Sequence, residues 1–173
     1  MRPQMKYVEC GRFLSQLPRK LSRIAALDVG TKHIGVALSD EGRLIAQPHS
    51  TIERGVGRNG SEAVSALARK IQTLVNAEQV DGLVVGAPMY QGKPTALCEE
   101  IVQLMLAIPC QAAAQTSNEE LIFTLWNENS STVEARRVSK ALGARRASFE
   151  RHKDELAAAV ILNSFLAQKW SST

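Results

Sequence analysis

The 173-residue chain has few cysteines and no long hydrophobic run, and each absence excludes a class of protein. Its three cysteines, Cys10, Cys98 and Cys110, are an odd number without Cys-x-x-Cys spacing, which excludes a disulfide scaffold and a cysteine zinc site and fits a reducing compartment. No apolar stretch approaches the ~20 residues of a membrane-spanning helix, so we expect no membrane partner. Repeats and low-complexity tracts are also absent. The length and the 45% hydrophobic content therefore predict one globular domain.

Basic residues are unevenly distributed along the chain, although the net charge is only +4. Residues 1–23 hold six basic side chains and one acidic one, and residues 136–153 hold seven basic side chains and one acidic one. The stretch between them, residues 24–135, is acidic overall. Concentrated basic charge favours a polyanionic partner such as nucleic acid, and a solvated helix face explains the same charges equally well.

Residues 1–23 are predicted to be a basic lead-in that precedes a single domain over residues 24–170. The lead-in lacks the apolar core of a secretory signal. It has the basic, acid-poor character of an organellar transit peptide, but it contains only two serines. We therefore expect a cytoplasmic protein, with a chloroplast or mitochondrion as the alternative location.

The pattern of apolar runs and turns predicts an α/β domain in which helices flank a mixed five-stranded sheet. Short apolar runs bounded by turn residues indicate the strands, and apolar residues at helical spacing indicate the helices. The expected strands cover 24–29, 34–39, a segment starting at 44, 80–85 and 121–126, and the expected helices cover 61–75, 95–108, 131–142 and 154–169, with an irregular insert at 110–118.

Three carboxylates stand where these predicted elements end. Asp28 closes the first strand, Glu128 follows the fifth, and Asp154 opens the last helix. Taken singly, each has an ordinary explanation: a turn cap, a solvated loop residue and a helix-start residue. Taken together, the three carboxylates predict one shared site, because the ends of strands and helices in an α/β sheet converge on one crevice.

Three carboxylates in one crevice repel one another unless a divalent cation neutralises them. Mg2+ prefers oxygen ligands and keeps waters for substrate phosphates. Two such ions ~4 Å apart activate a water and stabilise the leaving oxygen in phosphodiester cleavage. The basic stretch 136–153 begins and ends near the same acids in the chain, where it could hold a phosphate backbone.

Four segments, taken in order, resemble the motifs of the YqgF family. The first is Ile24-Ala-Ala-Leu-Asp-Val-Gly-Thr-Lys-His-Ile-Gly-Val-Ala-Leu-Ser-Asp40. The second is Val84-Val-Gly-Ala-Pro88, with Gly92 in the loop after it, and the third runs over residues 125–137. The last is Lys153-Asp-Glu-Leu-Ala-Ala-Ala-Val-Ile-Leu162. The resemblance spans residues 24–168, and the family contains the RuvX-type proteins known as Holliday-junction resolvases or pre-16S rRNA nucleases.

The resemblance implies an RNase H-like fold and a nuclease that uses Mg2+ or Mn2+. The family's three metal-binding acids fall on Asp28, Glu128 and Asp154, which are then catalytic residues. The implied substrate is structured nucleic acid, with precursor rRNA ends favoured and branched DNA as the alternative, bound by a monomer or a homodimer. The expected phosphate contacts are basic side chains: Lys32, Arg136, Arg137, Lys140, Arg145, Arg146 and Arg151.

The third motif departs from the family pattern. Asn127-Glu128-Asn129 stands where the family usually has Asp-Glu-Arg, so one carboxylate and one cation are lost beside the site. A rival hypothesis is therefore a catalytically silent nucleic-acid-binding protein, or one that assembles with ribosomal proteins. The sugar kinase, actin and chaperone ATPases share an Asp-x-Gly-Thr hairpin, but they need two such domains and a second phosphate motif that this chain lacks.

Overall fold

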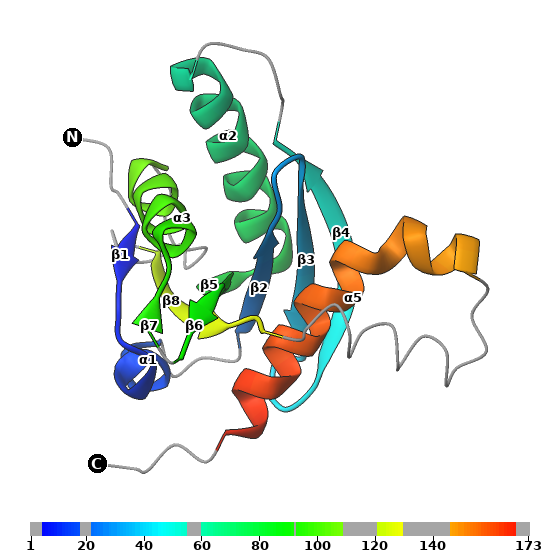
Figure 1. Cartoon of the computed structure of the whole chain (residues 1–173). Helices are drawn as coiled ribbons and strands as arrows, with labels where there is room; N and C mark the ends of the chain where they lie inside the picture. The colour runs from blue at the N-terminus through cyan, green and yellow to red at the C-terminus, as the bar shows by residue number, and fades with distance from the viewer. Residues whose placement is uncertain are drawn as a thin grey trace.

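The computed structural model describes residues 5–17, 22–54, 60–91, 93–108, 121–129 and 146–168. These residues form eight strands and four helices (Figure 1). In chain order the elements are β1 Lys6–Tyr7, α1 Cys10–Gln16, β2 Arg23–Val29, β3 His33–Ser39, β4 Ala46–Glu53, α2 Gly60–Glu78, β5 Val80–Ala87, β6 Met89–Tyr90, β7 Lys93–Pro94, α3 Ala96–Ala107, β8 Ile122–Asn127 and α5 Arg146–Ala167. The predicted α/β class is confirmed.

Six strands make the main sheet, in the order β1-β8-β5-β2-β3-β4. Strands β2, β3 and β4 are antiparallel neighbours because short turns join them, whereas β5 and β8 run parallel to β2 and are reached through crossovers that contain α2 and α3. The sequence pattern predicted five of these strands and missed β1, which is two residues long and pairs with the outer edge of β8. Strand β2 lies inside the sheet, so its last residues are flanked by β3 and β5.

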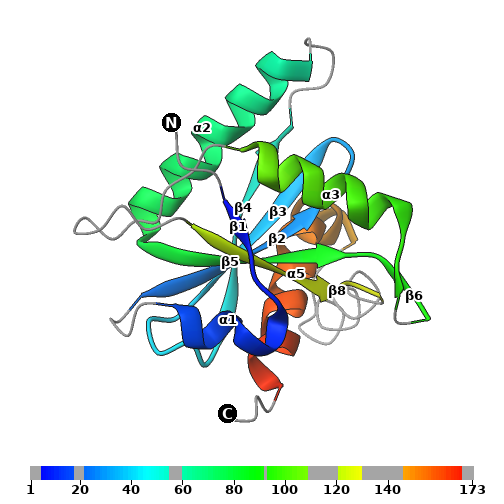
Figure 2. The same ribbon diagram turned by 90° about the vertical axis from the view of Figure 1, so that its left-hand side faces the viewer.

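The two faces of the sheet bury different side chains, because successive residues of a strand point to opposite faces. On one face Leu27 and Val85 pack with Ile71 of α2. On the other face Ala26 and Val84 pack with Phe165 of α5. Figure 2 shows this layering, with α2 and α3 on one side of the sheet and α1 and α5 on the other. Helix α5 lies across β2, β3 and β4 (Figure 1).

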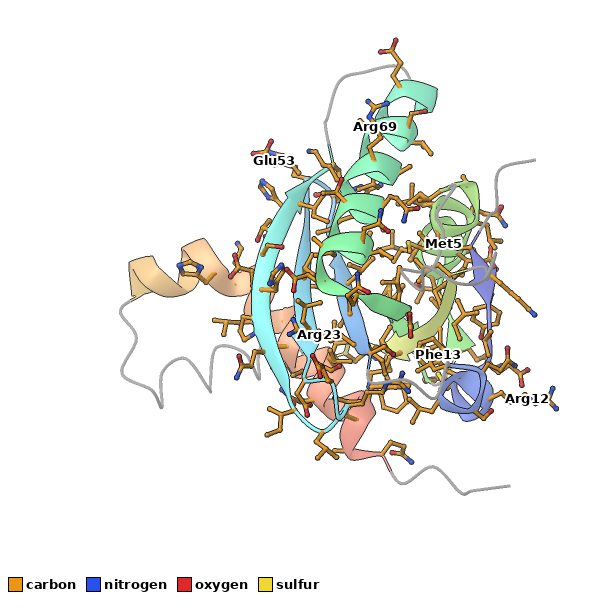
Figure 3. The ribbon with its side chains drawn as sticks, turned by 180° about the vertical axis from the view of Figure 1, so that it is seen from behind. Met5, Arg12, Phe13, Arg23, Glu53 and Arg69 are labelled. Carbon is orange, nitrogen blue, oxygen red and sulfur yellow. The ribbon has the colours of Figure 1, made fainter. Side chains whose placement is uncertain are left out.

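The N-terminal lead-in contributes structure to the same core. Phe13 of α1 and Leu17, which follows the helix, are buried and come so close to Gly82 of β5 that a Cβ there would lie 2.6 Å from the Phe13 ring. Figure 3 shows Phe13 pointing toward the sheet while Arg12 of the same helix points into solvent. Residues 5–17 thus cover part of the sheet face on which α5 also lies, and the domain boundary at residue 23 stays a prediction.

Helix α5 begins earlier than the sequence pattern indicated. Asp154 was expected to open it, but the helix starts at Arg146 and Asp154 lies eight residues inside. The residues between them include Ala147 and Lys153, which favour helix, so a carboxylate there was no reliable mark of a helix start. The predicted helix at 131–142 and the insert at 110–118 lie outside the described residues.

The third strand of the sheet begins later than predicted. Leu44 was expected to open it, but β4 starts at Ala46, and Leu44 and Ile45 are exposed. The Asp40 carboxylate accepts hydrogen bonds from the backbone N–H groups of both Leu44 and Ile45, at 2.7 Å each, and so holds them in the turn. These bonds lower the pKa of Asp40. Among the described helices, none is long and apolar enough to cross a membrane.

Candidate active site

Asp28 lies between two glycines on the α5 face of the sheet. Gly35 of β3 is its direct partner in the antiparallel register. Gly86 of β5 is the next residue after Val85, which pairs with Leu27. A glycine inside a strand marks a place where another part of the chain approaches closely. Each of these two glycines makes room for one further carboxylate residue.

Glu128 reaches toward Asp28 across Gly86. A Cβ on Gly86 would lie 2.6 Å from Cδ1 of Ile161 on α5, 3.0 Å from Oε2 of Glu128 and 3.4 Å from Cβ of Glu128, so a larger residue would crowd both side chains. The Glu128 backbone N–H donates to the carbonyl oxygen of Ala87, at 3.2 Å, which fixes the residue at the end of β5. Because β5 separates β8 from β2, the side chain at position 86 must be absent for Glu128 to meet Asp28.

Asp154 is placed above Gly35 by α5. A Cβ on Gly35 would lie 1.9 Å from the Asp154 carbonyl oxygen and 2.2 Å from its carbonyl carbon, so the helix backbone rests directly on β3. The Asp154 carboxylate is one-third exposed, and its Oδ2 lies 4.0 Å from Nδ1 of His33. Asp154 therefore enters the site from the interior of a helix rather than from its N-terminus.

The pKa of Asp28 is shifted by both of the other acids. Its pKa is raised to about 7, first by burial and then by the charges of Glu128 and Asp154. The hydrogen bond between Asp28 and Glu128 raises the pKa of Asp28 and lowers that of Glu128. The pKa of Glu128 is still raised overall, because its burial outweighs that bond. Carboxylates placed this close repel one another when ionised, which is the condition that a bound cation relieves.

The donor atoms of the cluster suit a hard divalent cation. All three side chains offer carboxylate oxygens, the ligand type that Mg2+ and Mn2+ prefer. Oε2 of Glu128 is buried without a hydrogen-bond partner, a costly state that a cation would remove. Across the part of the chain that the structure describes, no three His, Cys, Asp or Glu side chains lie in an arrangement that could hold a metal ion. Asp28 and Glu128 are in contact, and Asp154 acts on Asp28 through its charge.

The two asparagines that break the family pattern have structural contacts. Oδ1 of Asn127 accepts a hydrogen bond from the backbone N–H of Asn129, at 2.9 Å. Nδ2 of Asn129 donates to the carbonyl oxygen of Met89, which lies on β6. Together these bonds brace the loop that carries Glu128 on both sides. The substitution of Asp-Glu-Arg by Asn-Glu-Asn thus leaves the position of Glu128 supported.

Of the basic residues expected to contact phosphate, the structure describes the side chain of Lys32. Lys32 is exposed in the turn between β2 and β3, two residues before Ile34. The Arg54 backbone N–H donates to the Lys32 carbonyl oxygen at 2.9 Å, and the Arg54 guanidinium donates to the Gly30 carbonyl oxygen at 2.7 Å. The remaining expected contacts, Arg136, Arg137, Lys140, Arg145, Arg146 and Arg151, have side chains outside the described set.

The sequence pattern did not single out Gly86 as part of the site. It also allowed Asp28 to be only the cap of the following turn. A glycine in the buried run Val84–Ala87 was a usable signal, because a strand interior gains packing from any larger side chain. The turn after β2 is closed by the Gly30 N–H donating to the His33 carbonyl oxygen at 2.9 Å, so a cap by Asp28 is not needed there.

The chain is similar to a known protein family and to named relatives. The family described as "RuvX: Holliday junction resolvase" matches residues 22–168. A Lachnospira eligens protein named "Putative pre-16S rRNA nuclease" is 36% identical over 151 residues, which cover 85% of this chain and 98% of that protein. A Rhizobium rhizogenes protein of the same name is 35% identical over 143 residues, covering 83% of this chain and 79% of that protein.

The fold is also found in a solved resolvase. Thermus thermophilus RuvC, in complex with a Holliday junction substrate, superposes with a TM-score of 0.51 at 17% sequence identity, covering 84% of this chain and 94% of that one. At that identity the likeness concerns the fold, which is the RNase H-like arrangement of a mixed sheet flanked by helices. The matched family range includes Asp28, Glu128 and Asp154, and the chain belongs to the RuvX family.

Proposed function

We propose that the protein is a nuclease that cleaves phosphodiester bonds in structured nucleic acid with the help of Mg2+ or Mn2+. The observation that supports the proposal is the contact between Asp28 and Glu128 with the charge of Asp154 acting on Asp28, whose pKa is raised to about 7 by burial and by the two other acids. A cluster of half-buried carboxylates destabilises a folded protein, and such clusters are found mainly at functional sites. Cation binding for hydrolysis is the purpose that these residues suit best.

In this proposal Asp28, Glu128 and Asp154 hold the divalent cation through their oxygens. The cation supplies a nucleophilic water at neutral pH and neutralises charge on the departing oxygen. The chain positions the acids: Glu128 is held at the end of β5 by its backbone bond to Ala87, and Asp154 by the rigid helix α5. Lys32 and the basic segment 136–153 bind the phosphates on either side of the cleaved bond.

Precursor rRNA ends are the favoured substrate, and a four-way DNA junction is the second candidate. The first rests on the relatives, which are named for pre-16S rRNA. The second rests on the family description and on the fold shared with a junction-bound resolvase. Junction cleavage would favour a two-fold dimer, because that substrate has two symmetric strands to cut, whereas rRNA processing can be done by a monomer. The free thiols Cys10 and Cys98 favour the reducing cytoplasm as its location.

Purified protein incubated with labelled precursor rRNA and four-way DNA in parallel, each with Mg2+, Mn2+ or EDTA, tests the proposal. We expect metal-dependent cleavage of the precursor rRNA at a defined position, with little cleavage of the junction. Cleavage of the junction alone would select the second candidate. Binding of both substrates without cleavage of either would instead support the silent nucleic-acid-binding hypothesis that Asn127 and Asn129 suggested.

Neutralising Arg145 and Arg146 together, as Arg145→Gln/Arg146→Gln, should weaken binding of all nucleic-acid sequences to a similar degree. Each phosphate contact contributes roughly 0.7 to 0.9 to the slope of log affinity against log salt concentration, so the slope should become shallower by about 1.5. Fluorescence anisotropy over a salt series measures it. An unchanged slope would mean that these two side chains face solvent in the complex.

A further inference from the structure

A short hairpin projects from the edge of the candidate site. Strands β6 and β7 pair with each other in a separate two-stranded sheet, beyond the end of β5 (Figures 1 and 2). Tyr90 stands three residues after Ala87, whose carbonyl oxygen holds the Glu128 backbone. Three residues of extended chain span at most about 11 Å, so Tyr90 is within one or two nucleotides of the carboxylates.

The exposed face of this hairpin combines an aromatic ring with a cation. Tyr90 is 71% exposed, the most exposed aromatic side chain of the described residues. Its cross-strand partner in the β6–β7 register is Lys93, which is exposed as well. Directly opposed residues of an antiparallel pair point to the same side, so ring and ammonium group are neighbours. An exposed aromatic ring beside a cation is the combination by which proteins hold unpaired nucleotides, since the ring stacks on a base and the cation contacts a phosphate.

The hairpin is held in place relative to Glu128 and α3. The Asn129 side-chain amide donates to the Met89 carbonyl oxygen, which ties β6 to the residue after Glu128. On the other side the Thr95 hydroxyl donates to the Pro88 carbonyl oxygen at 2.9 Å and caps the N-terminus of α3. The turn at Gln91 has a positive φ of 49°, as a tight two-residue connection requires. The hairpin that carries Tyr90 is therefore held by hydrogen bonds on both sides, so ordering it costs little conformational entropy on binding.

We propose that the β6–β7 hairpin is a nucleotide platform, in which Tyr90 stacks on an unpaired base and Lys93 contacts the adjacent phosphate. The substrate is then a nucleic acid with a single-stranded segment next to the cleaved bond, because a base inside a duplex cannot present its face to a ring on a hairpin. This inference rests on the proposed nuclease function and narrows its substrate class.

The test measures binding of two probes in EDTA, so that no cleavage competes. One probe is a short single-stranded RNA that contains 2-aminopurine, and the other is the fully paired duplex of the same sequence. Tyr90→Ala should weaken single-strand binding by about tenfold and leave duplex binding unchanged, since stacking on an aromatic ring accounts for a factor of that size per base. The change in 2-aminopurine fluorescence on binding should also be lost. Tyr90→Phe keeps the ring and should behave as the unaltered protein.

Leu97→Ala is the matched control, because Leu97 is also a large apolar side chain that is about half exposed, on α3 next to the hairpin. It should leave both affinities unchanged. Equal loss of single-strand and duplex binding in Tyr90→Ala, or no loss at all, would overturn the platform. If the protein cleaves rRNA with Mg2+ while Tyr90→Ala binds both probes normally, only the platform fails. If neither probe binds the unaltered protein, the proposed function fails with it.

Discussion

Asp28→Asn should reduce metal-dependent cleavage by roughly a thousandfold while the protein still folds. Asn is similar in size to Asp but cannot supply a negative oxygen, and charge stabilisation by a catalytic cation amounts to several kcal/mol. Cleavage of labelled substrate under single-turnover conditions measures the loss. Asp40→Asn makes the same chemical change at the other end of β3, where the side chain only braces a turn, and should retain full cleavage. Full cleavage by Asp28→Asn would exclude Asp28 as a metal ligand.

The same substitution should make the metal-free protein more stable, and increasingly so as pH rises. The folded protein raises the pKa of Asp28 from 3.8 to about 7, so the protonated side chain favours folding fully below pH 4. That contribution falls between pH 4 and pH 7 and is lost above pH 7, where Asp28 is ionised beside Glu128. Asn resembles the protonated acid at every pH. We expect a gain on the order of 4 kcal/mol at pH 8 and almost none at pH 4, because the shift spans about three tenfold steps of the protonation equilibrium and each corresponds to about 1.4 kcal/mol.

Urea unfolding of both proteins in EDTA, at pH 4.5 and at pH 8, measures this difference. Adding Mg2+ at pH 8 should stabilise the unaltered protein and have little effect on Asp28→Asn, because the cation takes the place of the proton. Equal stability of the two proteins at both pH values would contradict the inference that Asp28 lies half-buried beside other carboxylates, whatever the cleavage assay shows.

Gly35→Ala should be severely destabilising and should also abolish cleavage. The new Cβ would lie 1.9 Å from the Asp154 carbonyl oxygen, a contact between backbone atoms that no side-chain rotation relieves. Helix α5 must move away from β3, which removes core packing and carries Asp154 away from Asp28. Overpacking of this kind costs about 3 kcal/mol and more where the neighbour is rigid. Urea unfolding measures the stability, and cleavage below the unfolding transition measures the site.

Gly11→Ala is the control for that experiment. Gly11 is exposed in α1, and no atom lies within 4 Å of a Cβ placed there. Because alanine favours helix over glycine, this substitution should raise stability by about 0.5 to 1 kcal/mol and leave cleavage unchanged. A Gly35→Ala protein as stable and as active as the unaltered one would show that α5 does not rest on β3 at this point.

The local pattern of the sequence was sufficient to predict most of the strands and helices and to identify the three candidate acids. Apolar runs of strand length and helical spacing of apolar residues located β2, β3, β5, β8, α2 and α3 to within a few residues. They did so because burial on one face or on both imposes a period that survives in the sequence. Asp28 stood out because a carboxylate in an apolar strand is costly, and that cost is a local property.

The position of Asp154 inside helix α5 and the space that Gly86 leaves for the Glu128 side chain could not be predicted from the sequence, because both depend on the tertiary structure. Residues 146–153 show no helical period of apolar residues, so periodicity could not mark the start of helix α5 at Arg146. The close approach of α5 to Gly35, and of Glu128 to Gly86, joins residues about 40 to 120 positions apart. Local residue preferences carry no information about such contacts.

By itself, the sequence determined the α/β class, the family motifs and the three candidate acids, since each of these depends only on residue type and short-range spacing. Only the tertiary structure decided that the glycines on either side of Asp28 admit the Glu128 side chain and the Asp154 backbone, and that Tyr90 and Lys93 share one exposed face near them. The physical reason is that proximity, burial and the raised pKa of Asp28 arise from packing between distant segments, which exists only once the chain has folded.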